Sequence, residues 1–212
     1  MRVEKSTYSK LNDTDFNNLK FGEVFTDHMF VCDYEDGNWV DPRIVPYKKI
    51  EIEPSANVFH YGQAVFEGMK AYKDDSGKIW LFRPIENYKR ISISSERLAM
   101  PRLGEDIFLS ALNELLLIDG DWVKPGIGNS VYIRPFIFGS EYCIAATPSK
   151  KYKFMIILSP VQSYYNDSIK VLVAEKYTRA ANGGVGYAKA AGNYGSQFYP
   201  TRLAQKEGYD QI

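Results

Sequence analysis

The sequence predicts an α/β fold that is divided into two domains. Three observations favour this class: short apolar segments joined by Asp and Gly turns, two helical segments with one apolar face, and apolar runs late in the chain. Of the 212 residues, 45% are hydrophobic and 15% are aromatic, which provides enough apolar material for a large core. Intrinsic disorder is therefore excluded.

Two β-hairpins are predicted in the first part of the chain. The first joins residues 29–34 to residues 39–40 through an Asp-Gly turn, which favours positive φ values. In the second, residues 69–73 alternate apolar and polar side chains, and the polar turn DDSG connects them to residues 79–82. Each pair of segments should form two antiparallel strands.

Two helices are predicted next. Pro84 fits the first turn of a helix because that position needs no backbone donor, and helical spacing continues over residues 85–100. Glu105 and Asp106 then begin a second helix, where negative charge interacts favourably with the helix dipole, and Gly120 ends it. The apolar face of this second helix consists of Phe108, Leu112, Leu115 and Leu116.

Three strands are predicted in the later part of the chain. Residues 130–139 are rich in β-branched and aromatic side chains, and Pro135 among them predicts an edge strand or a bulge. Residues 153–161 and 169–174 have the apolar character of strands that are buried on both faces.

The polar segment 161–168 has the composition of an interdomain linker. An N-terminal α/β domain then covers residues 1–160. Residues 169–212 are too short for a domain, and they contain a glycine-rich stretch and a helix over residues 194–207 that Pro200 should kink. We therefore expect these residues to be the beginning of a larger domain.

The charge and the cysteine content exclude several classes of partner. The chain has 26 basic and 26 acidic residues, so no overall field attracts nucleic acid or a membrane surface. The longest apolar run, residues 154–158, is too short to cross a bilayer. Two cysteines are too few for a disulfide framework, which favours a cytoplasmic location.

Several enzyme chemistries are excluded by the inventory of side chains. His28 and His60 are the only histidines, and Cys32 and Cys143 are far apart, so no metal site with zinc spacing is predicted. The sequence contains no GxSxG motif and no GxxxxGK[ST] loop, which excludes the common serine hydrolases and P-loop proteins.

Lys189 is the only charged residue between positions 180 and 200, where the 25% charged composition predicts about five. A lysine among Gly, Ala and Tyr can be desolvated, which disfavours its ammonium form and provides a nucleophilic amine. The structural alternative is a lysine whose stem packs on small residues while its head reaches water. Composition alone leaves both explanations open.

Four blocks in the chain decide between these explanations. The segment GYAKAAGNYGS around Lys189 resembles the cofactor-lysine segment of pyridoxal-phosphate enzymes with the aminotransferase class IV fold. FHYGQAVFEGMKAY (59–72), LFRPIENYKR (81–90) and VYIRPFIFGSE (131–141) are similar to branched-chain amino-acid aminotransferase, in the same order and at similar spacing. The resemblance covers about residues 20–212 and implies a complete small N-terminal domain followed by the start of the cofactor domain.

The resemblance implies a pyridoxal 5′-phosphate site. Lys189 would hold the cofactor as a Schiff base and act as the catalytic base. Tyr194 would bind the phenolic oxygen of the cofactor, and Arg90 would bind its phosphate, with Arg179 close to it. Without the resemblance, Tyr194 has an equally good explanation as a core tyrosine, and each arginine as a solvent-exposed side chain.

The resemblance also implies a substrate site that accepts apolar side chains and glutamate. Arg134 would bind the distal carboxylate of glutamate, with Tyr132 beside it. Phe66 and Tyr61 would form apolar walls, and Tyr61 is expected to reach the site of a partner subunit. Without the resemblance, these two aromatic residues would be ordinary core residues. A lid aromatic is expected at Tyr164 or Tyr165.

The implied reaction is transamination of Leu, Ile or Val with 2-oxoglutarate by a homodimer or a larger homo-oligomer. The family's chain continues past Ile212, and the missing part carries the carboxylate that pairs with the pyridine nitrogen of the cofactor. We therefore expect the full-length parent to be active and residues 1–212 alone to be inactive.

Three other functions remain open at this point. A D-amino-acid aminotransferase and an aminodeoxychorismate lyase share the fold and the lysine, although we do not recognise FEGMKAY or YIRPFIFG in them. The third alternative is a non-catalytic module that binds a partner, which would bind no pyridoxal phosphate.

Overall fold

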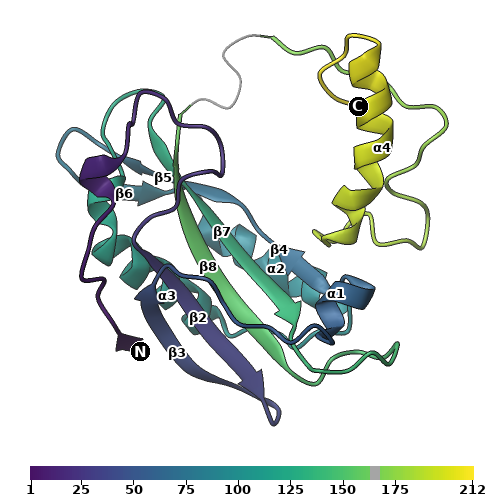
Figure 1. The fold of residues 1–212 in the computed structure, drawn as a ribbon, viewed down its shortest axis with the longest axis horizontal. Coiled ribbons are helices and arrows are strands. Elements are labelled where there is room, and N and C mark those ends of the chain that lie inside the picture. Colours follow the sequence, from purple (N-terminus) through teal and green to yellow (C-terminus); the bar gives the residue numbers. More distant parts are fainter. Residues whose placement is uncertain (163–167) are drawn as a thin grey trace.

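The computed structural model describes residues 1–162 and 168–212, and it contains one mixed sheet with helices α2 and α3 on one face (Figure 1). Its strand order is β1-β3-β2-β8-β7-β5-β6, and β4 also pairs with β7. This arrangement confirms the predicted α/β class. The strands are β1 (Arg2–Val3), β2 (His28–Glu35), β3 (Asn38–Pro46), β4 (Ala64–Phe66), β5 (Met69–Lys73), β6 (Ile79–Leu81), β7 (Ser130–Gly139) and β8 (Tyr152–Val161). The helices are α1 (Asn57–Tyr61), α2 (Pro84–Arg97), α3 (Glu105–Ile118) and α4 (Gly192–Lys206), with 3-10 turns at Leu11–Asp13 and Gly120–Trp122.

Both predicted hairpins are confirmed. β2 and β3 pair antiparallel around a turn in which Asp36 and Gly37 have φ values of 49° and 83°. Positive φ at both central residues gives the turn the twist that two antiparallel strands require. β5 and β6 also pair antiparallel, with Ala71 opposite Leu81.

Both predicted helices in the first part are confirmed, and α2 ends three residues earlier than predicted. Ala99 has a φ of 53°, its amide donates to the Glu96 carbonyl, and the Met100 amide donates to the Ser95 carbonyl. These two bonds form the helix-ending motif that usually contains glycine at the left-handed position. Because Ala occupies that position here, the sequence did not reveal the end of the helix.

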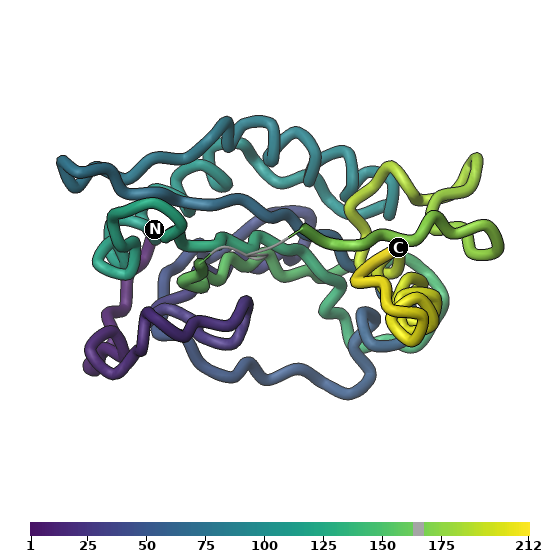
Figure 2. Tube along the Cα trace, turned by 90° about the horizontal axis from the view of Figure 1, so that it is seen from above, coloured from purple at the N-terminus to yellow at the C-terminus, as the bar shows by residue number. Residues whose placement is uncertain are grey.

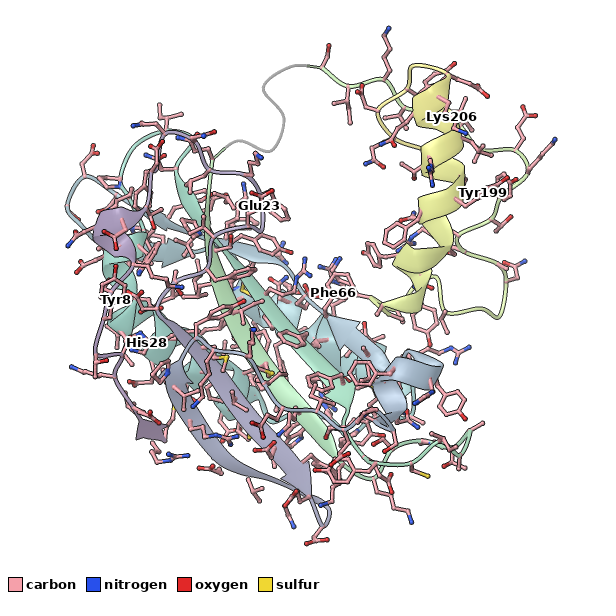
Figure 3. All side chains as sticks on the ribbon, in the orientation of Figure 1. Tyr8, Glu23, His28, Phe66, Tyr199 and Lys206 are labelled. Carbon is pink, nitrogen blue, oxygen red and sulfur yellow. The ribbon has the colours of Figure 1, made fainter. Side chains whose placement is uncertain are left out.

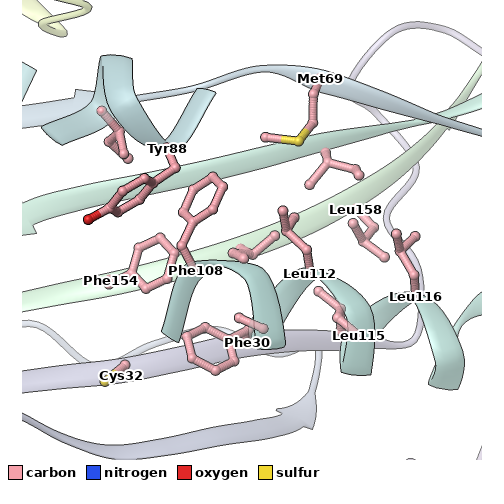
Figure 4. Packing of buried hydrophobic residues seen from close by; sticks show 14 of the residues in the cluster. Phe30, Cys32, Met69, Tyr88, Phe108, Leu112, Leu115, Leu116, Phe154 and Leu158 are labelled. Carbon is pink, nitrogen blue, oxygen red and sulfur yellow. The ribbon is translucent and has the colours of Figure 1, made fainter. Parts of the chain in front are cut away.

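The main core lies between the sheet and helices α2 and α3, which run along one face of the sheet (Figure 2). The four residues predicted on the apolar face of α3 are all buried there (Figure 4). A smaller apolar cluster covers the opposite face of the sheet, where Tyr47 and Ile52 pack against Met29, Val45 and Phe138.

The expectation of an edge strand or a bulge at Pro135 is wrong. β7 lies inside the sheet and pairs with β8 over its whole length without a shift in register. On the other side of β7 the pairing is interrupted: β5 pairs with β7 as far as Ile133, and the pairing with β4 begins at Phe136 of β7. The missing N–H of Pro135 lies opposite this break, where its carbonyl accepts a bond of 2.7 Å from the Glu67 amide.

The prediction of a buried strand over residues 169–174 is also wrong. Val171 forms one isolated bridge, with Gln211, and Val171 and Val173 are 53% and 84% exposed. A strand is stable only with neighbours along its length, and the described residues provide none here. The predicted helix near the C-terminus is confirmed as α4, which begins two residues early and includes Pro200.

The predicted linker, with Tyr164 and Tyr165 as candidate lid residues, lies mostly in residues 163–167, outside the described residues. The division into domains therefore stays a prediction. None of the helices in the described part of the chain has the length and apolar character needed to cross a membrane.

The packing of α3 gives a stability test. Leu112 is 1% exposed in the main core, so Leu112→Ala should lower the free energy of unfolding by about 2–5 kcal/mol, because it removes buried methyl groups and leaves a cavity. Leu117 on the same helix is 76% exposed, and Leu117→Ala should change that free energy by about 0.5 kcal/mol or less. Urea denaturation of the two variants measures both values, and equal effects would contradict this core assignment.

Candidate functional site

The site is built on β4, a short strand that the sequence did not predict. One edge of β4 pairs with β7, and the other edge binds the segment that contains Lys189. The Phe66 amide donates to the Lys189 carbonyl at 3.1 Å, and the Ala191 amide donates to the Ala64 carbonyl at 3.0 Å. These backbone bonds bring the lysine segment against the sheet, as Figure 1 shows beside the start of α4.

Two side chains, those of Ser94 and Asn193, also hold the lysine segment in place. The Lys189 amide donates to the Ser94 hydroxyl of α2 at 2.9 Å. The buried Asn193 side chain donates to the carbonyls of Val185 and Ala188 at 2.9 and 2.8 Å, which fixes the loop that precedes the lysine. Ala188 itself is buried, so a small side chain allows this close packing.

The Lys189 amine lies among aromatic rings. Nζ donates a hydrogen bond of 2.8 Å to the Tyr194 hydroxyl and lies 4.6 Å from the centre of the Phe66 ring. The Phe66 and Tyr194 rings are themselves 4.8 Å apart. Figure 3 labels Phe66 where the sheet faces the segment that begins α4. Lys189 is partly buried, and no carboxylate in the described part of the chain pairs with its amine.

The hydroxyl of Tyr194 is more acidic than an ordinary tyrosine. Burial alone would raise its pKa, but the hydrogen bond and the positive charge of Lys189, with a contribution from Arg179, lower the pKa below its usual value. The Arg179 guanidinium lies 5.4 Å from the centre of the Tyr194 ring. Lys189, Tyr194 and Arg179, three of the residues predicted for the site, are therefore close together.

Arg90 lies on α2 and is held by a buried carboxylate. Its Nε and Nη2 donate to the two carboxylate oxygens of Glu67 at 2.5 and 2.7 Å. This hydrogen bond raises the pKa of Arg90, and Tyr194 and Tyr132 add smaller contributions. The side chain of Arg90 is 51% exposed, whereas that of Glu67 is fully buried. Arg90 was predicted from the sequence, whereas Glu67 was not.

Arg134 and Tyr132 form a second part of the site on β7. Nη2 and Nε of Arg134 donate to the Tyr132 hydroxyl at 2.9 and 3.3 Å, and the guanidinium lies 4.6 Å from the centre of the Phe66 ring. Lys189 and Arg134 thus both contact the Phe66 ring. A β-carbon at Gly68 would collide with the Tyr132 hydroxyl, so a larger residue here would displace the Tyr132 ring.

A cavity of about 150 Å³ adjoins the Arg134 side of the site. Its lining residues are Phe21, Gly22, Phe25, Tyr132, Arg134, Ile157 and Ser159. A larger cavity, of about 550 Å³, lies along β2 and β3 and contains none of the predicted site residues. Lys189, Tyr194 and Arg90 line neither of these two cavities.

Tyr61 is the one predicted site residue that the structure does not bring to this cluster. It ends α1, is 47% exposed, and donates a hydrogen bond to the Ile144 carbonyl. It is thus exposed on the surface, away from the contacts that surround Lys189.

The donor set fits pyridoxal 5′-phosphate. An amine that faces aromatic rings can condense with an aldehyde, a tyrosine hydroxyl can donate to a phenolic oxygen, and partly exposed guanidinium groups can bind a phosphate. Lys189, Tyr194, Arg90 and Arg179 provide these groups, and all lie around one position.

Comparison with known proteins gives close relatives. The chain is 49% identical to branched-chain-amino-acid transaminase 1 of Bacillus subtilis and 46% identical to branched-chain-amino-acid aminotransferase 2 of the same organism. These matches cover 99% and 100% of this chain, and 60% and 59% of the relatives. The chain therefore spans about 60% of the length of the curated relatives it matches. No family model matches the chain.

Solved structures agree with these relatives. The branched-chain aminotransferase of Thermoproteus uzoniensis with norvaline has a TM-score of 0.67 at 23% identity, over 86% of this chain and 58% of that chain. The Escherichia coli enzyme has a TM-score of 0.64 at 24% identity, over 87% of this chain and 58% of that chain. At this identity the likeness concerns the fold, and it confirms the predicted fold class.

The contact between Lys189 and Tyr194 can be tested by titration of the protein without cofactor. The ultraviolet difference between the parent and Tyr194→Phe isolates the phenol, whose ionisation should have a midpoint below the ordinary value of 10. In a Lys189→Met background the midpoint should rise, because the positive donor is lost. Lys206→Met at the exposed end of α4 is the control and should leave the midpoint unchanged. The same midpoint with and without Lys189 would contradict the described contact.

Proposed function

The chain belongs to the branched-chain-amino-acid aminotransferase family, and from this premise we propose that the whole protein transfers the amino group of Leu, Ile or Val to 2-oxoglutarate. The observation that carries the proposal is the Lys189 amine, which faces Tyr194 and Phe66 at the position where the family resemblance expects the cofactor lysine. Because the chain spans about 60% of its relatives, the activity concerns the whole protein. The inactivity of residues 1–212 alone stays a prediction.

Pyridoxal 5′-phosphate is the proposed cofactor. Lys189 would bind it covalently, Tyr194 would bind its phenolic oxygen, and Arg90 and Arg179 would bind its phosphate. When bound, the cofactor supplies an electron sink that makes a substrate Cα–H bond acidic. A solved branched-chain amino acid aminotransferase that is complexed with N-(5′-phosphopyridoxyl)-L-glutamate has a TM-score of 0.60 to this chain, and it supports this choice.

The residues of the site have distinct tasks in this reaction. The Lys189 Nζ would take the proton from Cα of the amino-acid substrate, which needs a base held at a fixed position. The hydrogen bond to Tyr194 and the contact with Phe66 restrict the motion of this amine. The Tyr194 hydroxyl accepts the hydrogen bond from Lys189, so its own proton can be donated to a negatively charged oxygen.

The substrate side chain would contact Phe66 and Tyr132, and the distal carboxylate of glutamate would bind Arg134. One pocket then accepts both classes of substrate, because aromatic walls suit an apolar side chain and the cation suits a carboxylate. Tyr61 would complete the site of a partner subunit, and its exposed position away from Lys189 supports this role.

We also propose a homodimer or larger homo-oligomer in the cytoplasm. The free thiols of Cys32 and Cys143 are compatible with a reducing compartment. The names of the relatives are those of branched-chain enzymes and do not favour a D-amino-acid aminotransferase, an aminodeoxychorismate lyase or a non-catalytic module.

The cofactor proposal is tested with Lys189→Ala in the whole protein. The parent should show the visible absorbance of the bound cofactor and a borohydride-stable adduct on Lys189, and the variant should lose both because its amine is gone. Lys206→Ala should retain both signals, since that lysine is exposed at the end of α4. Mass spectrometry that finds the adduct on another lysine would refute the assignment.

The substrate proposal is tested with Arg134→Met, which keeps much of the volume of the side chain and removes its charge. The kcat/KM for 2-oxoglutarate should fall by about 10- to 100-fold, because one charge-assisted contact is lost. The corresponding value for leucine should change much less. Half-reaction kinetics with each substrate measure both values, and an equal loss for the two substrates would contradict a role in carboxylate recognition.

A further inference from the structure

Glu67 is a fully buried carboxylate beside the proposed cofactor site. It lies in the break between β4 and β5, where its amide donates to the Pro135 carbonyl at 2.7 Å. A buried carboxylate is costly unless donors surround it, so its surroundings must provide them. A side chain that served only to fill this space would be apolar. The charge of Glu67 therefore needs a reason in the contacts that it makes.

Four N–H donors surround Glu67. Arg90 donates from Nε and Nη2 at 2.5 and 2.7 Å, the Asn87 side chain donates at 2.8 Å, and the Gly68 amide donates at 3.2 Å. Three of these donors reach Oε2 and one reaches Oε1, so both carboxylate oxygens are hydrogen-bonded. Because two of the donor residues lie on α2, the carboxylate connects the helix to the break in the sheet.

The geometry of the Arg90 guanidinium is a consequence of this pairing. A guanidinium has five N–H groups in one plane, and the side that carries Nε and Nη2 is bonded to Glu67. Among the described residues, Arg90 donates only to Glu67, so the end that carries Nη1 and the second hydrogen of Nη2 is available for another oxyanion. Since the Arg90 side chain is 51% exposed, a ligand can reach this end.

We propose that Glu67 is a positioning residue, which holds the Arg90 guanidinium so that its free end binds the phosphate of the cofactor. The inference rests on the proposed function and deepens it. A fixed planar fork binds a phosphate better than a mobile one, because less side-chain freedom is lost on binding. The negative charge of Glu67 acts in the opposite direction, since it repels a phosphate. Positioning and repulsion thus predict opposite effects when this charge is removed.

The test compares the affinities of the whole protein for pyridoxal 5′-phosphate and for pyridoxal, which lacks the phosphate. Glu67→Gln keeps the size of the side chain and replaces one acceptor by a donor. We expect this variant to bind pyridoxal 5′-phosphate at least about tenfold more weakly and to bind pyridoxal nearly as before. Glu86→Gln is the matched control, because Glu86 lies on α2 with Arg90, is exposed and pairs with Lys89. The control should retain the parent's preference for the phosphate.

A second background shows whether Glu67 acts through Arg90. Arg90→Lys keeps a cation that can pair with Glu67 but lacks the planar fork. In this background, adding Glu67→Gln should cause no further loss of preference for the phosphorylated form. If Glu67→Gln does not fold, Asn87→Ala removes one donor to the carboxylate and leaves both charges in place. That variant should also lower the preference.

Each other result overturns the inference. Tighter binding of pyridoxal 5′-phosphate by Glu67→Gln would mean that repulsion dominates. An equal loss for both ligands would assign Glu67 a structural role only, and an unchanged preference in Asn87→Ala would do the same. If the parent binds pyridoxal 5′-phosphate through Lys189 and only the Glu67 result fails, the proposed function still holds. A parent that binds neither ligand would overturn both proposals.

Discussion

The arrangement of the site depends on one backbone interaction, the pairing of residues 189–191 with the free edge of β4. β4 has three residues, and its other edge is bonded to β7 inside the sheet. Because these bonds join backbone groups, they set the register of the lysine segment, and a slip of one residue would turn Lys189 to the opposite face. The contacts of its amine with Tyr194 and Phe66 follow from this register.

The site concentrates positive charge in a chain whose net charge is zero. Lys189, Arg90, Arg134 and Arg179 lie around two aromatic rings, and in the described part of the chain Glu67 is the carboxylate that pairs with one of them. A balanced composition therefore excludes a long-range field and says little about a local site. The aromatic faces between the cations reduce the cost of this proximity, because each ring attracts a positive group.

The parts of the structure that the sequence predicted have local causes. An Asp-Gly turn specifies the first hairpin, and Leu112 and its neighbours at helical spacing specify the buried face of α3. The missed features depend on distant residues. Ala99 ends α2 in a conformation typical of glycine, and Pro135 is tolerated in β7 because a partner strand stops opposite it. The apolar run over residues 169–174 indicated burial, but among the described residues its pairing is a single bridge to Gln211.

The same distinction applies to the site. The isolation of Lys189 among uncharged residues was visible in the sequence, and so was the order of the four blocks. The contacts of Ser94 and Glu67 were not, because their partners are 95 and 23 positions away. Ser94 lies on α2 and Glu67 lies between β4 and β5. A polar side chain is common at either place, so neither residue is distinguished by its own sequence neighbours. Residues that support a site through distant hydrogen bonds have no local signal, whereas a residue that departs from its own surroundings has one.

The position of Arg134 explains how one pocket can bind two classes of substrate in the proposed reaction. Its guanidinium is bonded to the Tyr132 hydroxyl and lies over the Phe66 ring, and none of the described carboxylates pairs with it. A carboxylate partner would offset part of this charge, as Glu67 does at Arg90, where the proposed gain is the fixed orientation of the guanidinium. An arginine held by a neutral hydroxyl and a ring keeps its full charge for the substrate. The same ring presents an apolar surface, so a branched side chain and a carboxylate can each bind without a rearrangement of the sheet.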